Sequence, residues 1–168
     1  MSKNKKRLRI IAGPNGSGKS NYFDFLSKEL NTGYFINADL IENILQNKGF
    51  INLNHFNIKA TKNDFDDFCN EQESKSLIEK SLKENHKIQL KFIENFIIDR
   101  LGSNQKYEGS LIASFIRKQL IKSNQSFSFE TVMSHGSKLD FIKEAKAQGY
   151  ATYLYFICIM ILNQIFQE

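Results

Sequence analysis

The sequence predicts an α/β fold in which a parallel sheet is flanked by helices, and two observations predict it. A short apolar run, residues 8–12, leads into a glycine-rich loop and then into residues 21–30, whose apolar positions recur at helical spacing. Further strand-like and helix-like segments then alternate along the chain, an order typical of a parallel sheet with crossover helices. The length of 168 residues is near the usual size of one domain, so we expect a single domain over residues 1–168.

The loop between the first strand and the first helix fits the Walker A pattern G-x-x-x-x-G-K-[ST] without a gap. Its glycines let backbone N–H groups point at a phosphate chain, and the following helix adds its positive end. Lys19 would reach the β- and γ-phosphates of ATP, and the Ser20 hydroxyl would bind Mg²⁺. With strand and helix both in place, the sequence predicts a P-loop NTPase fold that binds a nucleoside triphosphate. The expected binding residues are Gly13, Pro14, Asn15, Gly16, Ser17, Gly18, Lys19 and Ser20.

A second strand over residues 34–36 follows a turn that contains Gly33. It ends in Asn37-Ala38-Asp39, where a helix is expected to begin. The apolar residues at helical spacing predict that one face of this helix is buried. That expected face consists of Leu40, Ile41, Ile44 and Leu45.

Residues 50–108 are polar and rich in Asn and Lys, and we interpret them as a helical insertion. Within this insertion, residues 64–81 fit one helix. Residues 87–101 are ambiguous between a strand and a helix, because their apolar residues match both periods.

The remaining chain predicts helix, strand, helix and strand in that order. An amphipathic helix is expected over residues 110–121 and an alternating strand over 126–132. A helix over 137–148 should turn Leu139, Ile142 and Ala145 inward and end at Gly149. The last strand is expected over 151–160. The apolar run 150–162 is too short to cross a bilayer, so we interpret it as a buried strand and expect no membrane contact.

Composition excludes several other classes of protein. Hydrophobic residues make up 41% and charged residues 24%, as in a globular protein. The net charge of +5 resides in a leader that contains Lys3, Lys5, Lys6, Arg7 and Arg9, and the remaining 18 basic and 18 acidic residues balance. Because no basic helix face follows this leader, we expect a solvated arm and no nucleic-acid role.

Neither the cysteines nor the histidines have the spacing of a zinc or iron site. Cys69 and Cys158 are expected to be free thiols in a reducing compartment. No signal-peptide core precedes the first strand, so we expect a cytoplasmic protein.

Two carboxylates are candidates for catalysis, because ligands of open parallel sheets bind beyond the carboxyl ends of the strands. Asp39 could accept a proton from a substrate hydroxyl or act on Mg²⁺ through water, and it could equally be the N-cap of the helix from Leu40. Glu130 interrupts an apolar strand, where an unpaired carboxylate is costly. A substrate, an Mg²⁺-bound water or Lys19 would explain it, as would a solvent-facing edge position. His135 follows closely and is expected in an exposed loop.

The loop, the sequence Ile-Asn-Ala-Asp at 36–39 and the sequence Phe-Glu-Thr-Val-Met-Ser-His at 129–135 together resemble the zeta-toxin-like family of P-loop kinases. The resemblance covers about residues 9–157 and is weakest over 49–108. It implies Lys19 as the phosphate-binding lysine, Asp39 as the catalytic base, and Glu130 as a substrate- or Mg²⁺-site carboxylate. It also implies a small hydroxyl compound as phosphate acceptor, a nucleotide-activated amino sugar in the founding toxins, and an antitoxin protein as a partner to look for.

The chain departs from this family at its end. Family members carry arginines after the last matched strand, in a region that closes over the phosphates, whereas the only arginines here after the loop are Arg100 and Arg117. The apolar tail, 159–168, fits a truncated or frameshifted terminus. Since a missing arginine costs about 10³–10⁵-fold in rate, the alternative function is a catalytically weak nucleotide-binding regulatory protein.

Overall fold

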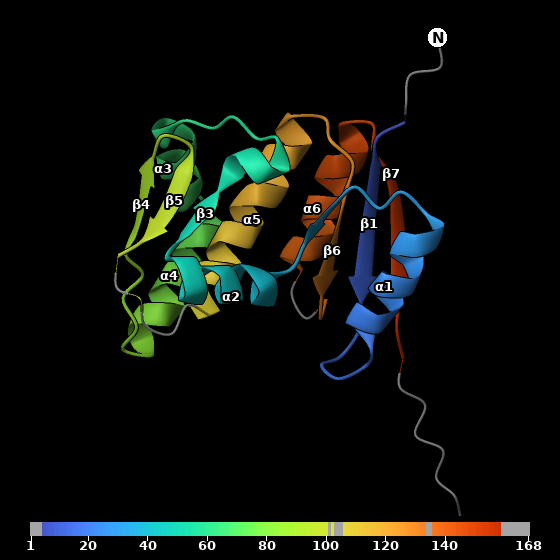
Figure 1. Cartoon of the computed structure of the whole chain (residues 1–168), viewed down its shortest axis with the longest axis horizontal. Coiled ribbons are helices and arrows are strands. Elements are labelled where there is room, and N and C mark those ends of the chain that lie inside the picture. Colours follow the sequence, from blue (N-terminus) through green and yellow to red (C-terminus); the bar gives the residue numbers. More distant parts are fainter. Residues whose placement is uncertain (1–4, 101, 103–105, 134–135, 159–168) are drawn as a thin grey trace, which may run out of the picture.

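Four parallel strands form the central sheet of the protein, in the order β2-β6-β1-β7 (Figure 1). The computed structural model describes residues 5–100, 102, 106–133 and 136–158. All four strands run in the same direction, so their carboxyl ends lie at one edge of the sheet. This arrangement confirms the predicted α/β fold. The strands are β1 (Arg7–Ala12), β2 (Tyr34–Ile36), β6 (Phe127–Thr131) and β7 (Ala151–Phe156).

Helices cover both faces of this sheet. Successive strand residues point to opposite faces, so Phe35 and Ile36 face different helices. Ile36 joins the main core beneath α5 (Lys106–Lys122) and α6 (Ser137–Ala147). On the opposite face, Phe35 stacks on Phe23 of α1 (Lys19–Glu29), with ring centroids 3.6 Å apart. Helix α5 is buried along most of its length and forms the centre of the molecule.

Helix α2 (Ala38–Lys48) begins where the sequence predicted, directly after β2. Its predicted apolar face is only half correct, because Ile41 and Leu45 are buried whereas Leu40 and Ile44 are 50% and 37% exposed. Helix α2 packs mainly on α5 and β3, and the four residues span more of its circumference than this packing covers.

The inserted segment is a mixed unit in which two helices accompany a three-stranded antiparallel sheet, in the order β3-β5-β4. The helix expected over 64–81 is broken at Glu71 into two shorter helices. The ambiguous residues 87–101 contain a β-hairpin, β4–β5, whose turn residues Glu94 and Asn95 have φ angles of 47° and 68°. The elements are β3 (Phe50–Asn52), the 3₁₀ turn η1 (Leu53–Phe56), α3 (Lys62–Asn70), α4 (Gln72–Lys83), β4 (Leu90–Ile93) and β5 (Phe96–Asp99).

Aromatic packing joins this unit to the rest of the molecule. Phe65 of α3 lies 5.1 Å from Phe115 of α5 and 5.9 Å from Phe92 of β4, measured between ring centroids. Phe68 packs on the same Phe115 ring at 5.3 Å. Residues of both sheets therefore belong to one continuous core.

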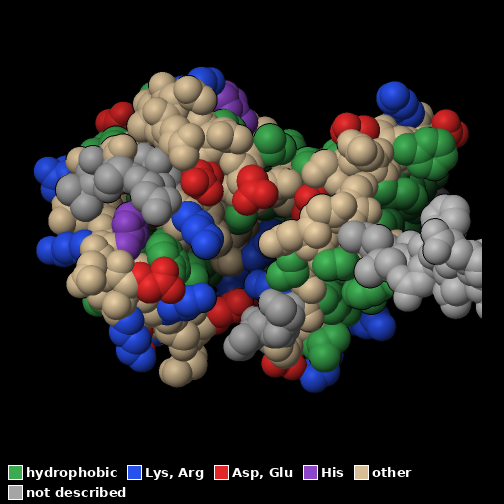
Figure 2. Space-filling model, turned by 90° about the horizontal axis from the view of Figure 1, so that it is seen from below, with side chains coloured by type: hydrophobic (Ala, Val, Ile, Leu, Met, Phe, Trp, Pro, Cys, Tyr) green, Lys and Arg blue, Asp and Glu red, His purple; other side chains and the backbone are tan. Residues whose placement is uncertain are grey.

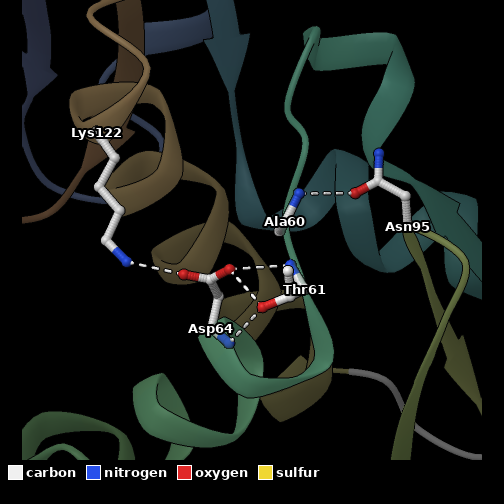
Figure 3. Close-up of polar contacts among 5 residues, drawn as sticks. All are labelled: Ala60, Thr61, Asp64, Asn95 and Lys122. Carbon is white, nitrogen blue, oxygen red and sulfur yellow. Dashed lines mark hydrogen bonds and ion pairs between the residues drawn. The ribbon is translucent and has the colours of Figure 1, made fainter.

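Polar contacts fix the start of α3 against its neighbours (Figure 3). Thr61 and Asp64 form a reciprocal capping box at the helix N-terminus. Lys122 of α5 donates to the Asp64 carboxylate at 3.1 Å. The Thr61 hydrogen bonds lower the pKa of this carboxyl most, and Lys122 adds to that lowering. The Asn95 side chain accepts from the Ala60 N–H at 3.1 Å, so the hairpin turn is tied to the segment that precedes α3.

The last strand corrects two predictions. β7 ends at Phe156, and Ile157 and Cys158 follow it outside any strand, whereas residues 159 and 160 of the expected range, with the rest of the tail 159–168, lie outside the described residues. β7 is also not buried, because Leu154 and Phe156 are 52% and 57% exposed. Within the described part of the chain it pairs with β1 alone, and α6 packs near its start. In α6, Leu139 is 54% exposed, whereas Ala145 is buried as predicted.

The basic leader is not wholly a solvated arm. Arg7 and Arg9 belong to β1, and Arg9 is only 5% exposed beside the Tyr153 ring. Lys6 lies over the Tyr150 ring and donates to the Gln148 carbonyl. Among the described helices, none combines the length and the apolar character that crossing a bilayer requires.

Candidate active site

The glycine loop joins the carboxyl end of β1 to the first turn of α1. The Gly13 N–H donates to the Thr131 carbonyl at 3.2 Å, so the loop starts against the end of β6. Gly18 is the N-cap of α1 with φ of 84°, a left-handed conformation that glycine adopts without a steric penalty. In the described part of the chain no side chain caps this helix, and its first turn holds no acidic residue. The first N–H groups of α1 and its positive end are thus available to an anion.

Lys19 folds back over the loop. Its ammonium donates to the carbonyl oxygens of Gly13 and Pro14 at 3.1 and 2.8 Å. These contacts hold the Lys19 ammonium at the mouth of the loop. A phosphate bound there would offer it charged oxygens in place of the two neutral carbonyl oxygens. The Ser17 hydroxyl is buried in the loop with no hydrogen-bond partner among the described residues.

Asn37, and not Asp39, caps helix α2. The Asn37 Oδ1 accepts from the N–H groups of Asp39 and Leu40 at 2.8 and 3.2 Å. The Asp39 side chain is exposed and has no capping role. The alternative role of Asp39 as the N-cap of this helix is therefore removed. Its carboxylate lies in the first turn of α2 and lines a cavity at the carboxyl ends of the strands.

The register of strand β6 places Glu130 near the first turns of α1 and α2. On its two sides, β6 places it opposite Ile11 of β1 and one residue beyond the pairing of Phe129 with Ile36 of β2. Its Oε2 accepts from the Asn37 amide at 3.2 Å and lies 3.4 Å from the Ser20 hydroxyl. Its Oε1 is buried and has no partner among the described residues.

Burial and a neighbouring negative charge disfavour the ionised form of Glu130. Burial raises the pKa of its carboxyl above the ordinary value of 4.5, and the negative charge of Asp39 adds to that rise. The Ser20 hydrogen bond and the Lys19 charge oppose it. A half-buried carboxylate with one unpaired oxygen is suited to a cation or a bound water.

These groups line one cavity of about 710 Å³ at the carboxyl ends of the strands. Figure 2 looks onto this end of the molecule, where a hollow opens with basic and acidic side chains around it. Lys19, Ser20, Asp39 and Glu130 all contribute to its wall, as does most of the open part of the loop. Gly13, Pro14 and Ser17, which the sequence also predicted to bind phosphate, do not line it. The loop residues that line the cavity are Asn15, Gly16, Gly18, Lys19 and Ser20.

Sequence reasoning missed two cations in this cavity, Arg117 of α5 and Lys138 of α6. Arg117 is 9% exposed, and its guanidinium lies 4.8 Å from the Phe129 ring centroid. A signal existed in the sequence, because Arg117 is four residues after Ala113 and three before Leu120 on the apolar face of its helix. Lys138 offered no such signal, since only the packing of α6 brings it to the cavity.

Arg100 does not line this cavity. Arg100 lies in the hairpin region, where its N–H donates to the Gln89 carbonyl, and His135 lies outside the described residues. In the described ranges no three His, Cys, Asp or Glu side chains converge as a metal site, and Cys69 and Cys158 are free thiols.

Comparisons with known proteins add little to this geometry. No family model and no curated protein matches the chain. Among solved structures, a crystal structure from Chloroflexus aurantiacus J-10-fl described as a "putative kinase" is similar, with 8% sequence identity and a TM-score of 0.48. The match covers 91% of this chain and 59% of that one, so the chain spans less than two thirds of the length of that protein. At this level of similarity the match says nothing about activity.

Proposed function

We propose that this protein is an ATP-dependent phosphotransferase that moves the γ-phosphate of ATP to a hydroxyl group of a small acceptor. The observation that carries the proposal is the convergence of Lys19, Ser20, Asp39 and Glu130 on one cavity. A phosphate-binding loop alone would fit any nucleotide-binding protein. Two carboxylates facing that loop, one of them without a structural role, favour chemistry on the bound nucleotide.

The loop and α1 would hold the phosphates of ATP. The uncapped N–H groups of α1 point toward the anion, and Lys19 would leave the carbonyls of Gly13 and Pro14 to meet the β- and γ-phosphates. Phosphoryl transfer is mostly positioning and charge stabilisation, so this cradle supplies a large part of the expected rate.

Ser20 and Glu130 fit a magnesium ion. The Ser20 hydroxyl is a hard oxygen ligand, and the unpartnered Glu130 Oε1 would accept from a water of the hydrated ion. Mg²⁺ commonly uses one or two protein oxygens beside substrate phosphates, which agrees with the absence of a larger acidic cluster among the described residues. When bound, the ion would neutralise charge on the phosphates.

Asp39 would be the base. It would take the proton of the acceptor hydroxyl while the acceptor oxygen forms the new bond to the γ-phosphorus. The bond between that phosphorus and the β–γ bridging oxygen breaks, which leaves ADP. The resemblance of the sequence to zeta-toxin-like kinases supports the same roles and suggests nucleotide-activated amino sugars as the first acceptors to try.

The test incubates the protein with γ-labelled ATP, Mg²⁺ and a pool of nucleotide sugars. We expect label in a new product, and in Asp39→Asn we expect unchanged ATP affinity with transfer about 10²–10⁴-fold slower. Asn43→Asp, which adds a carboxylate elsewhere on α2, is the control for helix effects. Transfer at the wild-type rate in Asp39→Asn would remove the base assignment, and ATP binding without any transfer would favour a nucleotide-binding regulatory protein.

A further inference from the structure

Asn37 lies between Glu130 and the first turn of α2. It follows β2 directly, and the pairing of Ile36 with Phe129 brings it beside Glu130, the next residue of β6. Asn37 is 9% exposed and forms part of the wall of the cavity. The register of one strand pair therefore places an uncharged amide next to both candidate carboxylates.

Both ends of this amide form hydrogen bonds. The Oδ1 accepts from the N–H groups of Asp39 and Leu40, and the Nδ2 donates to the Glu130 Oε2 at 3.2 Å. The helix N–H groups need an acceptor, so the oxygen of the amide faces α2 and its nitrogen faces Glu130. The two accepted bonds use both lone pairs of the oxygen, which therefore has none left for a ligand.

The contact with Asn37 determines which oxygen of Glu130 is free. Oε2 accepts from Asn37 and lies 3.4 Å from the Ser20 hydroxyl, so side chains from the starts of α1 and α2 both hold this oxygen. Oε1 is buried and has no partner among the described residues. Because Oε2 is held from two sides, the carboxylate has a defined orientation, and Oε1 is the oxygen that a ligand can use.

The same amide anchors the start of α2, where Asp39 lies. The Asp39 N–H is 2.8 Å from the Asn37 oxygen, and such bonds to the first N–H groups fix a helix terminus. We propose that Asn37 is a positioning residue, whose one side chain sets two groups at a fixed spacing. These are the base Asp39 and the free oxygen of Glu130, which would accept from the hydrated magnesium ion. This inference rests on the proposed function and adds to it the residue that links its two carboxylates.

Asn37→Ser separates the two contacts of the amide. The serine hydroxyl can still cap α2, but it ends one bond short of the amide nitrogen and cannot reach Glu130. Calorimetry measures the ATP affinity without and with Mg²⁺, and the ratio of the two affinities is the gain that the ion brings. We expect Asn37→Ser to leave the affinity without Mg²⁺ unchanged. The gain should be about three- to tenfold smaller, because Glu130 loses a hydrogen bond that holds it in place.

A double-variant cycle tests whether this effect passes through Glu130. In Glu130→Gln protein the carboxylate is already gone, so adding Asn37→Ser should change the Mg²⁺ gain by less than about twofold. If the two losses simply multiply, Asn37 does not act through Glu130 and the inference is wrong. Asn52→Ser makes the same change at the N-cap of η1 and should leave the gain at its wild-type value.

The rate of phosphate transfer tests the second contact. With saturating ATP, Mg²⁺ and the pool of nucleotide sugars, we expect transfer to fall about three- to tenfold from wild type to Asn37→Ser. It should fall further in Asn37→Ala, which also releases the N–H groups at the start of α2. A residue that only capped this helix would give equal rates in wild type and Asn37→Ser, and that result would overturn the positioning role.

The outcomes distinguish this inference from the proposed function. Weaker ATP binding by Asn37→Ser without Mg²⁺ would mean that the amide contacts the nucleotide itself, which contradicts a positioning role. A Mg²⁺ gain that is the same in Asn37→Ser and wild type, or absent from both, also overturns the inference. If wild-type protein binds no ATP, the proposed function and the inference both fail. If it binds ATP but transfers no label, only the proposed transfer fails, and the calorimetric cycle still decides whether Asn37 acts through Glu130.

Discussion

Replacing Gly13 with alanine tests how closely the glycine loop lies against the end of β7. A Cβ atom built at Gly13 would stand 2.5 Å from the Ile157 carbonyl oxygen and 2.8 Å from the Ser17 hydroxyl. The first of these is backbone, which cannot rotate away. The Gly13 φ angle of +154° adds strain for any residue with a side chain.

Both effects act in the same direction, so their sum can be bounded. Overpacking against a fixed neighbour costs about 1–3 kcal/mol, and the glycine-specific backbone conformation about 1–2 kcal/mol. We therefore expect Gly13→Ala to lower the free energy of unfolding by about 2–5 kcal/mol, with weaker ATP binding because the loop must shift.

Gly49→Ala is the matched control. Gly49 also has a positive φ angle, +74°, but no described atom lies within 4 Å of the Cβ position. It should lose only the conformational part, about 1–2 kcal/mol. The assay is urea unfolding followed by circular dichroism at 222 nm, since the chain has no tryptophan. If Gly13→Ala is no less stable than Gly49→Ala, the close approach between loop and strand is refuted.

Two further predictions concern the carboxylate end of the sheet. Asn37→Ala should lower the free energy of unfolding by about 1 kcal/mol, because α2 loses its N-cap. Asn37→Ser can still cap the helix and should recover most of this loss. Equal losses for the two variants in urea titrations would contradict the capping role. For Glu130, the raised pKa means that the folded protein binds the proton more tightly than the unfolded chain, so this group lowers stability as pH rises above about 4.5. Glu130→Gln should therefore flatten the decline of stability with pH and leave the nucleotide-free protein at least as stable as wild type at pH 7. It should also weaken Mg²⁺-dependent ATP binding, because the proposed magnesium site loses a carboxylate. A variant less stable than wild type at pH 7 would contradict the raised pKa of Glu130.

Much of the parallel sheet was predictable because its signals are local. The glycine loop fixes a strand before it and a helix after it, and Gly33 and Gly149 mark further boundaries. Because parallel strands share one carboxyl edge, the positions of Lys19, Asp39 and Glu130 in the sequence were enough to predict that they meet.

The features that the sequence did not predict depend mostly on contacts between distant segments. The β4–β5 hairpin had a signal, two apolar runs separated by Glu94-Asn95, but glutamate rarely adopts the positive φ angle seen here. The exposure of β7 could not be predicted, because an apolar strand does not reveal how many neighbours cover it. Lys138 likewise reaches the cavity only through the packing of α6.

In the proposed function, ATP binds with its phosphates at the glycine loop and Lys19. Isothermal titration calorimetry of the full chain with ATP and Mg²⁺ tests it most directly, with Lys19→Met and the exposed-residue control Lys28→Met measured alongside. We predict one site in the wild type and in Lys28→Met, and an affinity at least about tenfold lower in Lys19→Met, since charge-assisted contacts are lost. No heat from folded wild-type protein, or equal affinity in Lys19→Met, would contradict the account.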